Sequence, residues 1–346
     1  MRKIALAMAV VVALLVLYCT PSSNAQTTDK CTVIEWTVCF WTQQCIPLGG
    51  YYIGPGPGNS TVAWAAHSAA CPPIPKCHNC PQAGSPIILG DGDTFIAQTD
   101  VALPGLGGGI TLRRTWNSFW PPTEVGSSIG MFGPNWRSTY EERVFMDSDN
   151  YLTYARGDGN YWTFGSGGNG MIVASPANVS ATIAATNSTW TIAFQNGEQR
   201  QFNPATGLLT AIIDRNGNAT QLTYDSSNRL VTVTDPASRH LYFNYANSSS
   251  LLVTSVTSDF GITLSYAYDS LGRLVQVTKP DLTTVSFTYN AQSQITAVTD
   301  NNGKILESHT YDSSGRGLTS SQANGVNAVT VTYPPPPPAP PLYGQQ

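Results

Sequence analysis

A tyrosine recurs at a near-constant interval in the C-terminal half of this chain, and the repeat constrains the fold more than any other feature. The tyrosines are Tyr224, Tyr245, Tyr268, Tyr289 and Tyr311. The steps between them are 21, 23, 21 and 22 residues. A fixed period of about twenty residues is typical of stacked repeats, in which each unit buries against its neighbours a face that it cannot bury alone. The sequence therefore predicts a stacked repeat architecture.

The residues after the tyrosine predict a tight turn. In the fullest copies an aspartate follows at once, and an arginine comes four residues after the aspartate, preceded by glycine or asparagine. The aspartate side chain can accept a hydrogen bond from the backbone two residues on, and glycine or asparagine tolerates the positive φ of a tight turn. The turn residues are Asp225, Asn228 and Arg229; Asp269, Gly272 and Arg273; and Asp312, Gly315 and Arg316.

The segments on either side of this turn read as strands. Before the turn, large residues alternate, as in Leu264, Tyr266 and Tyr268, which places them on one face of a strand. After the turn, the apolar residues are three apart, as in Leu274 and Val277. Because a step of three breaks strict alternation, it predicts a bulge or a strong local twist.

A second turn separates these strands from the next repeat. Asn-Gly occurs between apolar alternations at residues 216–217 and 302–303, and this pair is a strong hairpin signal. One period is therefore two strands and two turns. We expect an all-β fold in which successive antiparallel hairpins form one long sheet that twists and curls.

The first 25 residues have the features of a secretory signal peptide. Arg2 and Lys3 precede an apolar run, residues 4–17, and residues 23–25 provide the small side chains of a cleavage site. The run is short for a bilayer span, and no second candidate follows it. The sequence predicts cleavage before Gln26 and a secreted or cell-surface protein without a membrane span.

The composition agrees with an exported β protein. Charged residues make up 11% of the chain, well below the usual share. Threonine, serine, asparagine, glycine and tyrosine are common instead, and they suit solvated strands and turns. Without Arg2 and Lys3, 15 basic residues stand against 21 acidic ones. A mildly acidic chain with no basic cluster is a poor binder of nucleic acid or of anionic membranes.

Six cysteines follow the signal peptide, all within a Cys- and Trp-rich segment at residues 26–84. They are Cys31, Cys39, Cys45, Cys71, Cys77 and Cys80. In an exported protein an even number predicts up to three disulfides, and fifteen pairings are open. Cys77 and Cys80 also have the spacing of a zinc knuckle, but no second pair is clear, so we expect disulfides and no metal.

The chain after the signal peptide divides into four predicted parts. Residues 26–84 form the disulfide module, and residues 85–205 form a glycine-rich domain of strands and turns. Residues 206–333 hold the repeats. Residues 334–346 are rich in proline and should form an extended polyproline helix.

Two sets of motifs together resemble a known family. The repeats look like the YD repeats of Rhs proteins, teneurins and Tc-type toxin shells. The segments at residues 84–86, 99–105, 112–118 and 130–137 resemble the N-terminal conserved domain of Rhs proteins, in the same order. The resemblance implies strands that spiral into a hollow wall. The family's self-cleaving protease and toxin regions are not recognisable here, so the resemblance does not extend self-processing or toxicity to this chain.

No catalytic or cofactor motif stands out. The sequence holds no nucleophile elbow, phosphate loop or zinc-protease motif, and its four histidines fall in none. We predict a non-enzymatic scaffold that forms part of an extracellular β-shell. An open sheet edge should recruit a second copy or a larger shell partner. The alternative is a carbohydrate or cell-wall binding module, in which sugars stack on exposed tryptophans of the Cys-rich segment: Trp36, Trp41 and Trp64.

Overall fold

A computed structural model gives the structure of the protein and describes ten segments of the chain. They are residues 32–39, 45–53, 82–89, 92–118, 129–146, 152–159, 161–166, 172–175, 181–185 and 188–333. The regular secondary structure of these segments is β-strand apart from two short 3-10 helices, so the all-β prediction is confirmed. Within them, no helix has the length and apolar character needed to cross a membrane.

The chain forms two compact units, which we describe separately. The described part of the first unit is a hairpin of β1 (Thr32–Cys39) and β2 (Cys45–Ile53), in which Cys39 pairs with Cys45 along the backbone. Its side chains lie outside the described part of the chain, so the predicted disulfides and tryptophan sites remain predictions. The signal peptide and the proline-rich tail also lie outside it.

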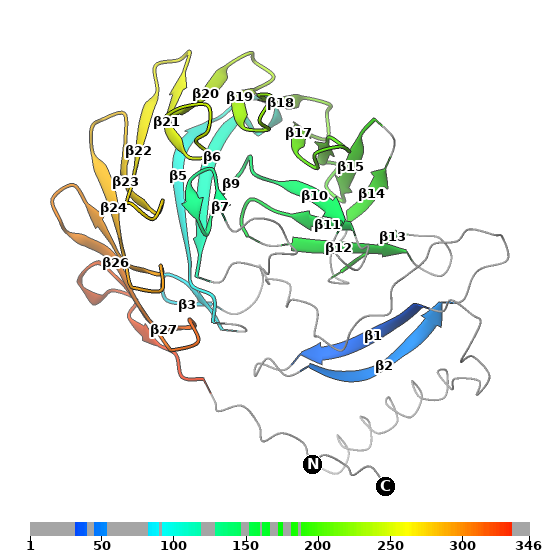
Figure 1. The fold of residues 1–346 in the computed structure, drawn as a ribbon, viewed down its shortest axis with the longest axis horizontal. Helices are drawn as coiled ribbons and strands as arrows, with labels where there is room; N and C mark the ends of the chain where they lie inside the picture. Colours follow the sequence, from blue (N-terminus) through cyan, green and yellow to red (C-terminus); the bar gives the residue numbers. More distant parts are fainter. Residues whose placement is uncertain are drawn as a thin grey trace, which may run out of the picture. The chain divides into compact units, whose positions relative to one another are not determined.

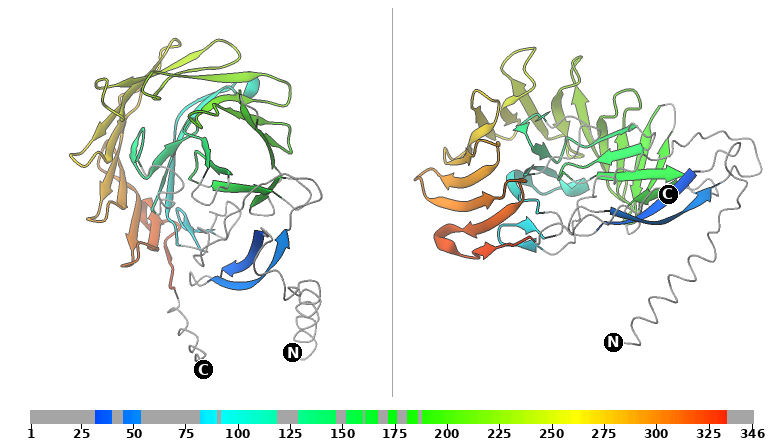
Figure 2. Two further views of the ribbon diagram at one scale, coloured as in Figure 1. Left: turned by 45° about the vertical axis from the view of Figure 1, so that its right-hand side comes forward. Right: turned by 60° about the horizontal axis from the view of Figure 1, so that its bottom comes forward.

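The second unit, Pro75–Gly165 with Ile172–Tyr333, contains a 15-stranded antiparallel sheet whose strands follow one another in chain order (Figure 1). The strands are β14 (Ala181–Ala185), β15 (Trp190–Phe194), β16 (Gln199–Phe202), β17 (Leu209–Ile213), β18 (Ala219–Tyr224), β19 (Leu230–Thr234), β20 (His240–Tyr245), β21 (Val253–Ser258), β22 (Thr263–Tyr268), β23 (Leu274–Thr278), β24 (Thr284–Tyr289), β25 (Ile295–Asp300), β26 (Ile305–Tyr311), β27 (Gly317–Gln322) and β28 (Val329–Thr330). The sheet curls strongly but does not close, since β14 and β28 are its two ends (Figure 2). The predicted curled sheet with an open edge is therefore confirmed.

Bulges occur where the sequence predicts them. The register shifts by one residue at each repeat tyrosine: between Thr223 and Tyr224, Asn244 and Tyr245, Ala267 and Tyr268, Thr288 and Tyr289, and Thr310 and Tyr311. A bulge increases the local twist of a strand. One bulge per hairpin therefore accompanies the steady curl of the sheet.

The N-terminal part of this unit forms smaller sheets that lie inside the curl (Figure 2). β5, β6 and β9 make one sheet, β10 to β13 make another, and β3–β4 and β7–β8 are short pairs. The elements are β3 (Gln82–Ala83), β4 (Ile87–Ile88), β5 (Phe95–Leu103), η1 (Leu106–Gly108), β6 (Ile110–Asn117), β7 (Ile129–Gly130), β8 (Gly133–Pro134), β9 (Trp136–Ser138), β10 (Arg143–Met146), β11 (Leu152–Ala155), β12 (Tyr161–Ser166) and β13 (Ile172–Ser175). A second 3-10 turn, η3 (Ala323–Gly325), follows β27.

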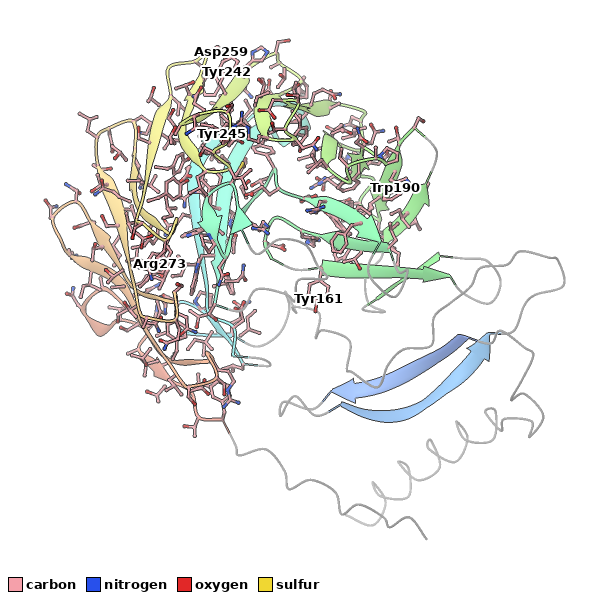
Figure 3. All side chains as sticks on the ribbon, in the orientation of Figure 1. Tyr161, Trp190, Tyr242, Tyr245, Asp259 and Arg273 are labelled. Carbon is pink, nitrogen blue, oxygen red and sulfur yellow. The ribbon has the colours of Figure 1, made fainter. Side chains whose placement is uncertain are left out.

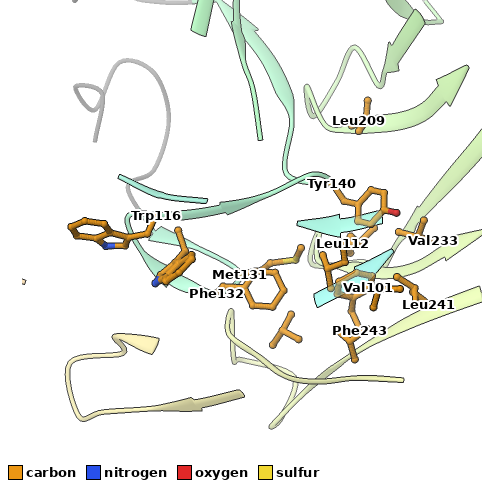
Figure 4. Packing of buried hydrophobic residues seen from close by; sticks show 14 of the residues in the cluster. Val101, Leu112, Trp116, Met131, Phe132, Tyr140, Leu209, Val233, Leu241 and Phe243 are labelled. Carbon is orange, nitrogen blue, oxygen red and sulfur yellow. The ribbon is translucent and has the colours of Figure 1, made fainter. Parts of the chain in front are cut away.

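One hydrophobic core joins the smaller sheets to the repeats. Leu112 and Phe132 from the N-terminal part pack in the same buried cluster as Val233, Leu241 and Phe243 from the repeats (Figure 4). The strands before the Tyr-Asp turns contribute alternate residues to this cluster, whereas the strands after these turns contribute residues three apart. Full burial of one such side chain stabilises the fold by about 1.5–3 kcal/mol. The concave face of the repeat sheet is therefore stabilised by the chain's own N-terminal part.

The long sheet also runs through the predicted boundary near residue 205. β14 to β16 precede this position and are continuous with β17 and the repeats that follow. These first strands carry no Tyr-Asp motif, so periodicity alone does not mark them as part of the sheet. The domain limits proposed from the sequence remain predictions.

Candidate functional site: the inner face of the repeat sheet

The repeat tyrosines form a ladder of hydrogen bonds from one hairpin to the next. Each phenol hydroxyl donates to a backbone carbonyl 15 or 16 residues earlier, at the start of the preceding hairpin's second strand. The pairs are Tyr224 to Leu209 at 2.8 Å, Tyr245 to Leu230 at 2.9 Å, Tyr268 to Val253 at 2.7 Å, Tyr289 to Leu274 at 2.7 Å, Tyr311 to Ile295 at 2.6 Å and Tyr333 to Gly317 at 2.6 Å. Burial raises the pKa of the first five tyrosines, so their hydroxyls remain protonated donors.

Tyr333 is a ladder member that the sequence reading missed. It follows Tyr311 by 22 residues, which fits the period, but proline and not aspartate comes next. A search for the Tyr-Asp motif therefore misses Tyr333, although the repeat spacing alone would have identified it. The ladder has six members and continues to the last described residue.

The Tyr-Asp turns are built as the motif predicts. In the first, the Oδ1 atom of Asp225 accepts hydrogen bonds from the backbone N–H groups of Ser227 and Arg229, at 2.9 and 3.0 Å. The Nε atom of Arg229 donates to Oδ2 at 2.8 Å. The residue before the arginine has positive φ in all three full copies: Asn228 at 61°, Gly272 at 73° and Gly315 at 86°. The backbone and side-chain donors of Arg229 lower the pKa of Asp225.

The arginine of each turn also reaches the next turn on the same side of the sheet. The guanidinium of Arg229 lies 4.5 Å from the ring centroid of Tyr245 and donates to the carbonyls of Asn247 and Ser250, both at 2.8 Å. Arg273 repeats the stacking on Tyr289 at 4.9 Å (Arg273 and Tyr245 are labelled in Figure 3). The arginines therefore tie consecutive repeats together at their turns.

One variant turn keeps the connection without charge. Asn290 and Gln294 replace the aspartate and arginine, and their side chains hydrogen-bond at 2.9 Å. The Nε2 atom of Gln294 then donates to the carbonyl of Gly315 at 2.8 Å. The link between turns therefore depends on a hydrogen-bond donor and not on an ion pair.

A buried ion pair fixes the N-terminal sheet against the middle repeats. Arg114 on β6 donates to the Oδ1 atom of Asp100 on β5 at 2.8 Å, and the hydroxyl of Tyr266 on β22 donates to Oδ2 at 2.8 Å. The guanidinium of Arg114 also lies 4.8 Å from the ring of Trp136. Burial alone would lower the pKa of Arg114, but Asp100 outweighs it and the net shift is upward. Arg114 stays charged, and loss of Asp100 would leave this buried charge uncompensated.

A second buried pair joins the inner segment to β16. The Nε atom of Arg200 lies 3.0 Å from the Oε2 atom of Glu142, which also accepts a hydrogen bond from the hydroxyl of Tyr154 at 2.6 Å. Burial raises the pKa of Glu142 and the charge of Arg200 opposes the rise. This pair anchors the N-terminal segment near the beginning of the repeats.

The end of the sheet is held by a polar clasp, which residues 84–89 and 92–94 form. The backbone N–H of Ser85 donates to the Oγ atom of Ser320 at 2.9 Å, and that hydroxyl donates back to the carbonyl of Ser85 at 3.1 Å. The N–H of Gly317 donates to the carbonyl of Gly92 at 2.8 Å. A side chain at position 317 would overlap the Oγ1 atom of Thr94, so glycine is needed there. The N-terminal part therefore spans the concave face from β16 to β27.

This face is a packed interior. The structure brings together the predicted tyrosines, aspartates and arginines of the repeats, in turns and ladder bonds. Across the described segments, no group of three or more His, Cys, Asp or Glu side chains has the arrangement of a metal site. The anchoring residues of the N-terminal part were not predicted from the sequence.

Comparisons with known proteins identify both parts of this unit. Residues 84–164 match a family described as "Domain of unknown function (DUF6531)", and residues 204–240 and 249–284 match the RHS Repeat. The structure thus has a repeat sheet with RHS sequence motifs, and the family resemblance seen in the sequence is confirmed. The chain therefore carries RHS repeats, and a segment that matches DUF6531 precedes them.

The similar curated proteins are much longer. The chain is 28% identical over 139 residues to the tRNA nuclease WapA of Bacillus subtilis (strain 168) and, to the same extent, to the tRNA3(Ser)-specific nuclease WapA of Bacillus spizizenii. The match covers 40% of this chain and 6% of those proteins.

Solved structures with some likeness are Tc toxin complexes. A TcdB2-TccC3-Cdc42 structure has a TM-score of 0.28 at 12% identity and covers 70% of this chain and 15% of that one. A Photorhabdus luminescens Tc holotoxin pore has a TM-score of 0.24 at 11% identity, with 63% and 14% of the two chains covered.

Proposed function

We propose that the protein is an exported, non-enzymatic scaffold that contributes a segment of RHS-type β-shell outside the cell. The supporting observation is the packing of the concave face. Residues of the DUF6531 segment, such as Trp116 and Trp136, are fully buried in one cluster with repeat residues such as Phe287. A face filled in this way contributes stability and leaves the outer face and the open edge for contacts.

The same packing assigns a role to the DUF6531 segment. A curled sheet with apolar residues along its inner side exposes a large apolar surface unless something covers it. Two buried ion pairs and the clasp hold the segment at the start, middle and end of the sheet. We propose that the segment is the internal core on which the RHS hairpins fold, and that neither part is stable alone.

The WapA relatives are named as tRNA nucleases, and this chain corresponds to a small share of their length. The proposal therefore assigns to this chain a scaffold role and no nuclease activity. Export by the predicted signal peptide at residues 1–25 belongs to the proposal as well, as does a partner at the open edge.

The test is a comparison of activity and folding on one preparation of the chain from residue 26. We expect a single cooperative unfolding transition, followed by the tryptophans of the core, and no cleavage of tRNA, glycan or peptide substrates above a heat-inactivated sample. Reproducible turnover that is lost with the folded sheet would overturn the scaffold proposal. Sequencing of the N-terminus of the secreted protein checks cleavage before Gln26.

A further inference from the structure

Three of the six exposed large aliphatic side chains in the described segments lie on one rim of the sheet. We call the turns at residues 214–218, 235–239, 258–262, 279–283, 300–304 and 322–326 the far rim, since they lie opposite the Tyr-Asp turns. Leu282 is 81% exposed, and Ile305 and Val326, beside the next two turns, are 51% and 55% exposed. The three lie at successive turns and approach the open end of the sheet at β28.

Leu282 has an unfavourable backbone conformation as well as an exposed side chain. Its φ is +65°, in the left-handed region that residues with branched side chains seldom adopt. The corresponding position is Gly217, Ser238, Gly261 and Gly303 in other far-rim turns, with φ between 60° and 88°. Neither local conformation nor burial favours leucine here. Strain and exposure at one residue indicate a contact that the isolated chain does not make.

The spacing of the far rim favours a second copy of this chain as its partner. Successive turns are separated by two strands, so they lie about 10 Å apart. The far rim of a second copy has the same spacing between turns, so several turns of the two copies can contact one another at once. A partner without this spacing could contact one turn but would not be in register with the next.

The charges beside the aliphatic row are self-complementary. The turn at 279–283 carries Lys279 and Asp281, and the turn at 300–304 carries Asp300 and Lys304. Each turn therefore has one charge of either sign. In a two-fold arrangement the same surface meets itself, so a lysine of one copy can oppose an aspartate of the other.

The far rim is also continuous with the edge of the sheet. The turn at 322–326 leads into β28, which pairs with β27 on one side and has no strand on its other side in the described part of the chain. A free edge offers backbone N–H and C=O groups for pairing with another strand. The edge faces along the sheet whereas the far rim lies at the ends of the strands, so the edge is not part of a rim-to-rim contact.

We infer that the far rim from Lys279 to Val326 is a self-association surface that binds the same surface of a second copy. The inference rests on the proposed scaffold function and deepens it by naming the partner. Leu282 is the most exposed contact residue, and Ile305 and Val326 follow it at the next two turns.

Leu282→Asn separates association from folding. Asparagine tolerates the left-handed conformation, so the substitution relieves strain in the monomer while it removes the apolar contact. We expect the wild-type chain from residue 26 to dimerise in a concentration series followed by sedimentation velocity. The variant should bind itself at least about tenfold more weakly, with an equal or higher Tm at a concentration at which both proteins are monomeric. The matched control is Leu271→Asn, which changes a leucine of similar exposure, 67%, in a Tyr-Asp turn.

The outcomes that overturn the inference are distinct. A wild-type chain that stays monomeric up to about 100 μM overturns it, as does equal weakening by the two variants. A fall in Tm for Leu282→Asn would make the leucine part of the fold and overturn it too. Catalytic turnover by an otherwise dimeric protein would instead contradict the scaffold function and leave the surface in place.

Discussion

The middle repeats and the last repeat use the same hairpin with different inner residues. At the first inner position after the Tyr-Asp turn, the middle repeats have Leu230, Val253, Leu274 and Ile295, whereas the last has Gly317. Three residues later, Val233, Val256, Val277 and Val298 give way to Ser320. Two residues before the tyrosine, Leu222, Phe243, Tyr266 and Phe287 give way to His309.

The difference follows from what packs on each region. The middle repeats face side chains of the N-terminal sheet, such as Trp136 and Phe132, and bury apolar surface against them. The last repeat faces the backbone of the clasp, and this contact needs close approach and hydrogen bonds. The last repeat therefore loses the apolar residues of the other repeats at the positions where it packs against backbone and not against apolar side chains.

The largest expected effect comes from breaking the apolar contact in the middle. The ring of Trp136 is fully buried and packs edge-on against Phe287 at 5.1 Å between centroids. Trp136→Ala should lower the free energy of unfolding by about 3–5 kcal/mol, because it leaves a cavity between the N-terminal sheet and the repeats. Urea denaturation measures the loss. Trp190→Ala, at a partly exposed position of β15, is the control and should cost clearly less; equal losses would contradict the proposed role of the inner face.

The second-largest effect is expected when Ser320 of the last repeat is replaced by the valine that the middle repeats have at the equivalent position. Ser320→Val makes the inner row more apolar, yet it removes the hydroxyl that satisfies both backbone groups of Ser85. We expect a loss of about 1–3 kcal/mol, the cost of leaving buried polar groups unpaired. Hydrogen exchange should show faster exchange at Ser85 before it does so elsewhere.

Ser265→Val, on the exposed face of β22, is the control for this change and should have little effect. A gain in stability from Ser320→Val would mean that the clasp contributes nothing and that the comparison of the two regions is wrong.

Much of this architecture could be predicted from the sequence, because it is local. The period, the Asp and Gly of each turn and the step of three after it specify hairpins, turns and bulges within about twenty residues, and all three appear where expected. The aspartate and arginine of each turn, such as Asp269 and Arg273, also meet as the motif implies.

The contacts between distant segments could not be predicted in this way. Ser85 and Ser320 are 235 residues apart, and no periodicity relates them. The same holds for Asp100 with Tyr266 and for Glu142 with Arg200. The sequence does show that the series of apolar residues on the concave face is interrupted at Gly317 and Ser320. This interruption indicates that a different segment packs against the last repeat, but it does not identify that segment.

A smaller effect should distinguish two tyrosines of the ladder. The hydroxyl of Tyr289 donates to the carbonyl of Leu274 and accepts from the Nε1 atom of Trp136 at 3.3 Å, whereas that of Tyr333 donates to the carbonyl of Gly317. Tyr333→Phe should cost about 1 kcal/mol, and Tyr289→Phe up to about 2 kcal/mol, since it also leaves a buried indole N–H unpaired. Thermal unfolding at matched pH measures both, and a larger loss for Tyr333→Phe would contradict the ordering.

The smallest expected effect tests whether the Tyr-Asp turns are alike in the middle and last repeats, although the residues on the concave face differ. The backbone and side-chain donors of Arg229 lower the pKa of Asp225. The pKa of Asp312 is lowered as well, because its bonds to Arg316 outweigh burial. A lowered folded-state pKa gives stability that is present above the unfolded value, about 3.9, and is lost as the pH falls through the folded value. Asp225→Asn and Asp312→Asn should each cost less than about 1 kcal/mol at pH 7, because both turns are solvent-screened.

The two variants should also converge with the wild type as the pH falls through the folded-state pKa of each aspartate, because the wild-type carboxylate then becomes protonated too. Urea midpoints across this pH range provide the measurement. If only Asp312→Asn changes the pH response, the last repeat differs from the middle repeats in its turn as well as in its inner row. The distinction between the two regions could then no longer be assigned to the neighbour that packs on the concave face. Equal responses would confine the difference to Gly317, Ser320 and His309, the three positions that lie on that face.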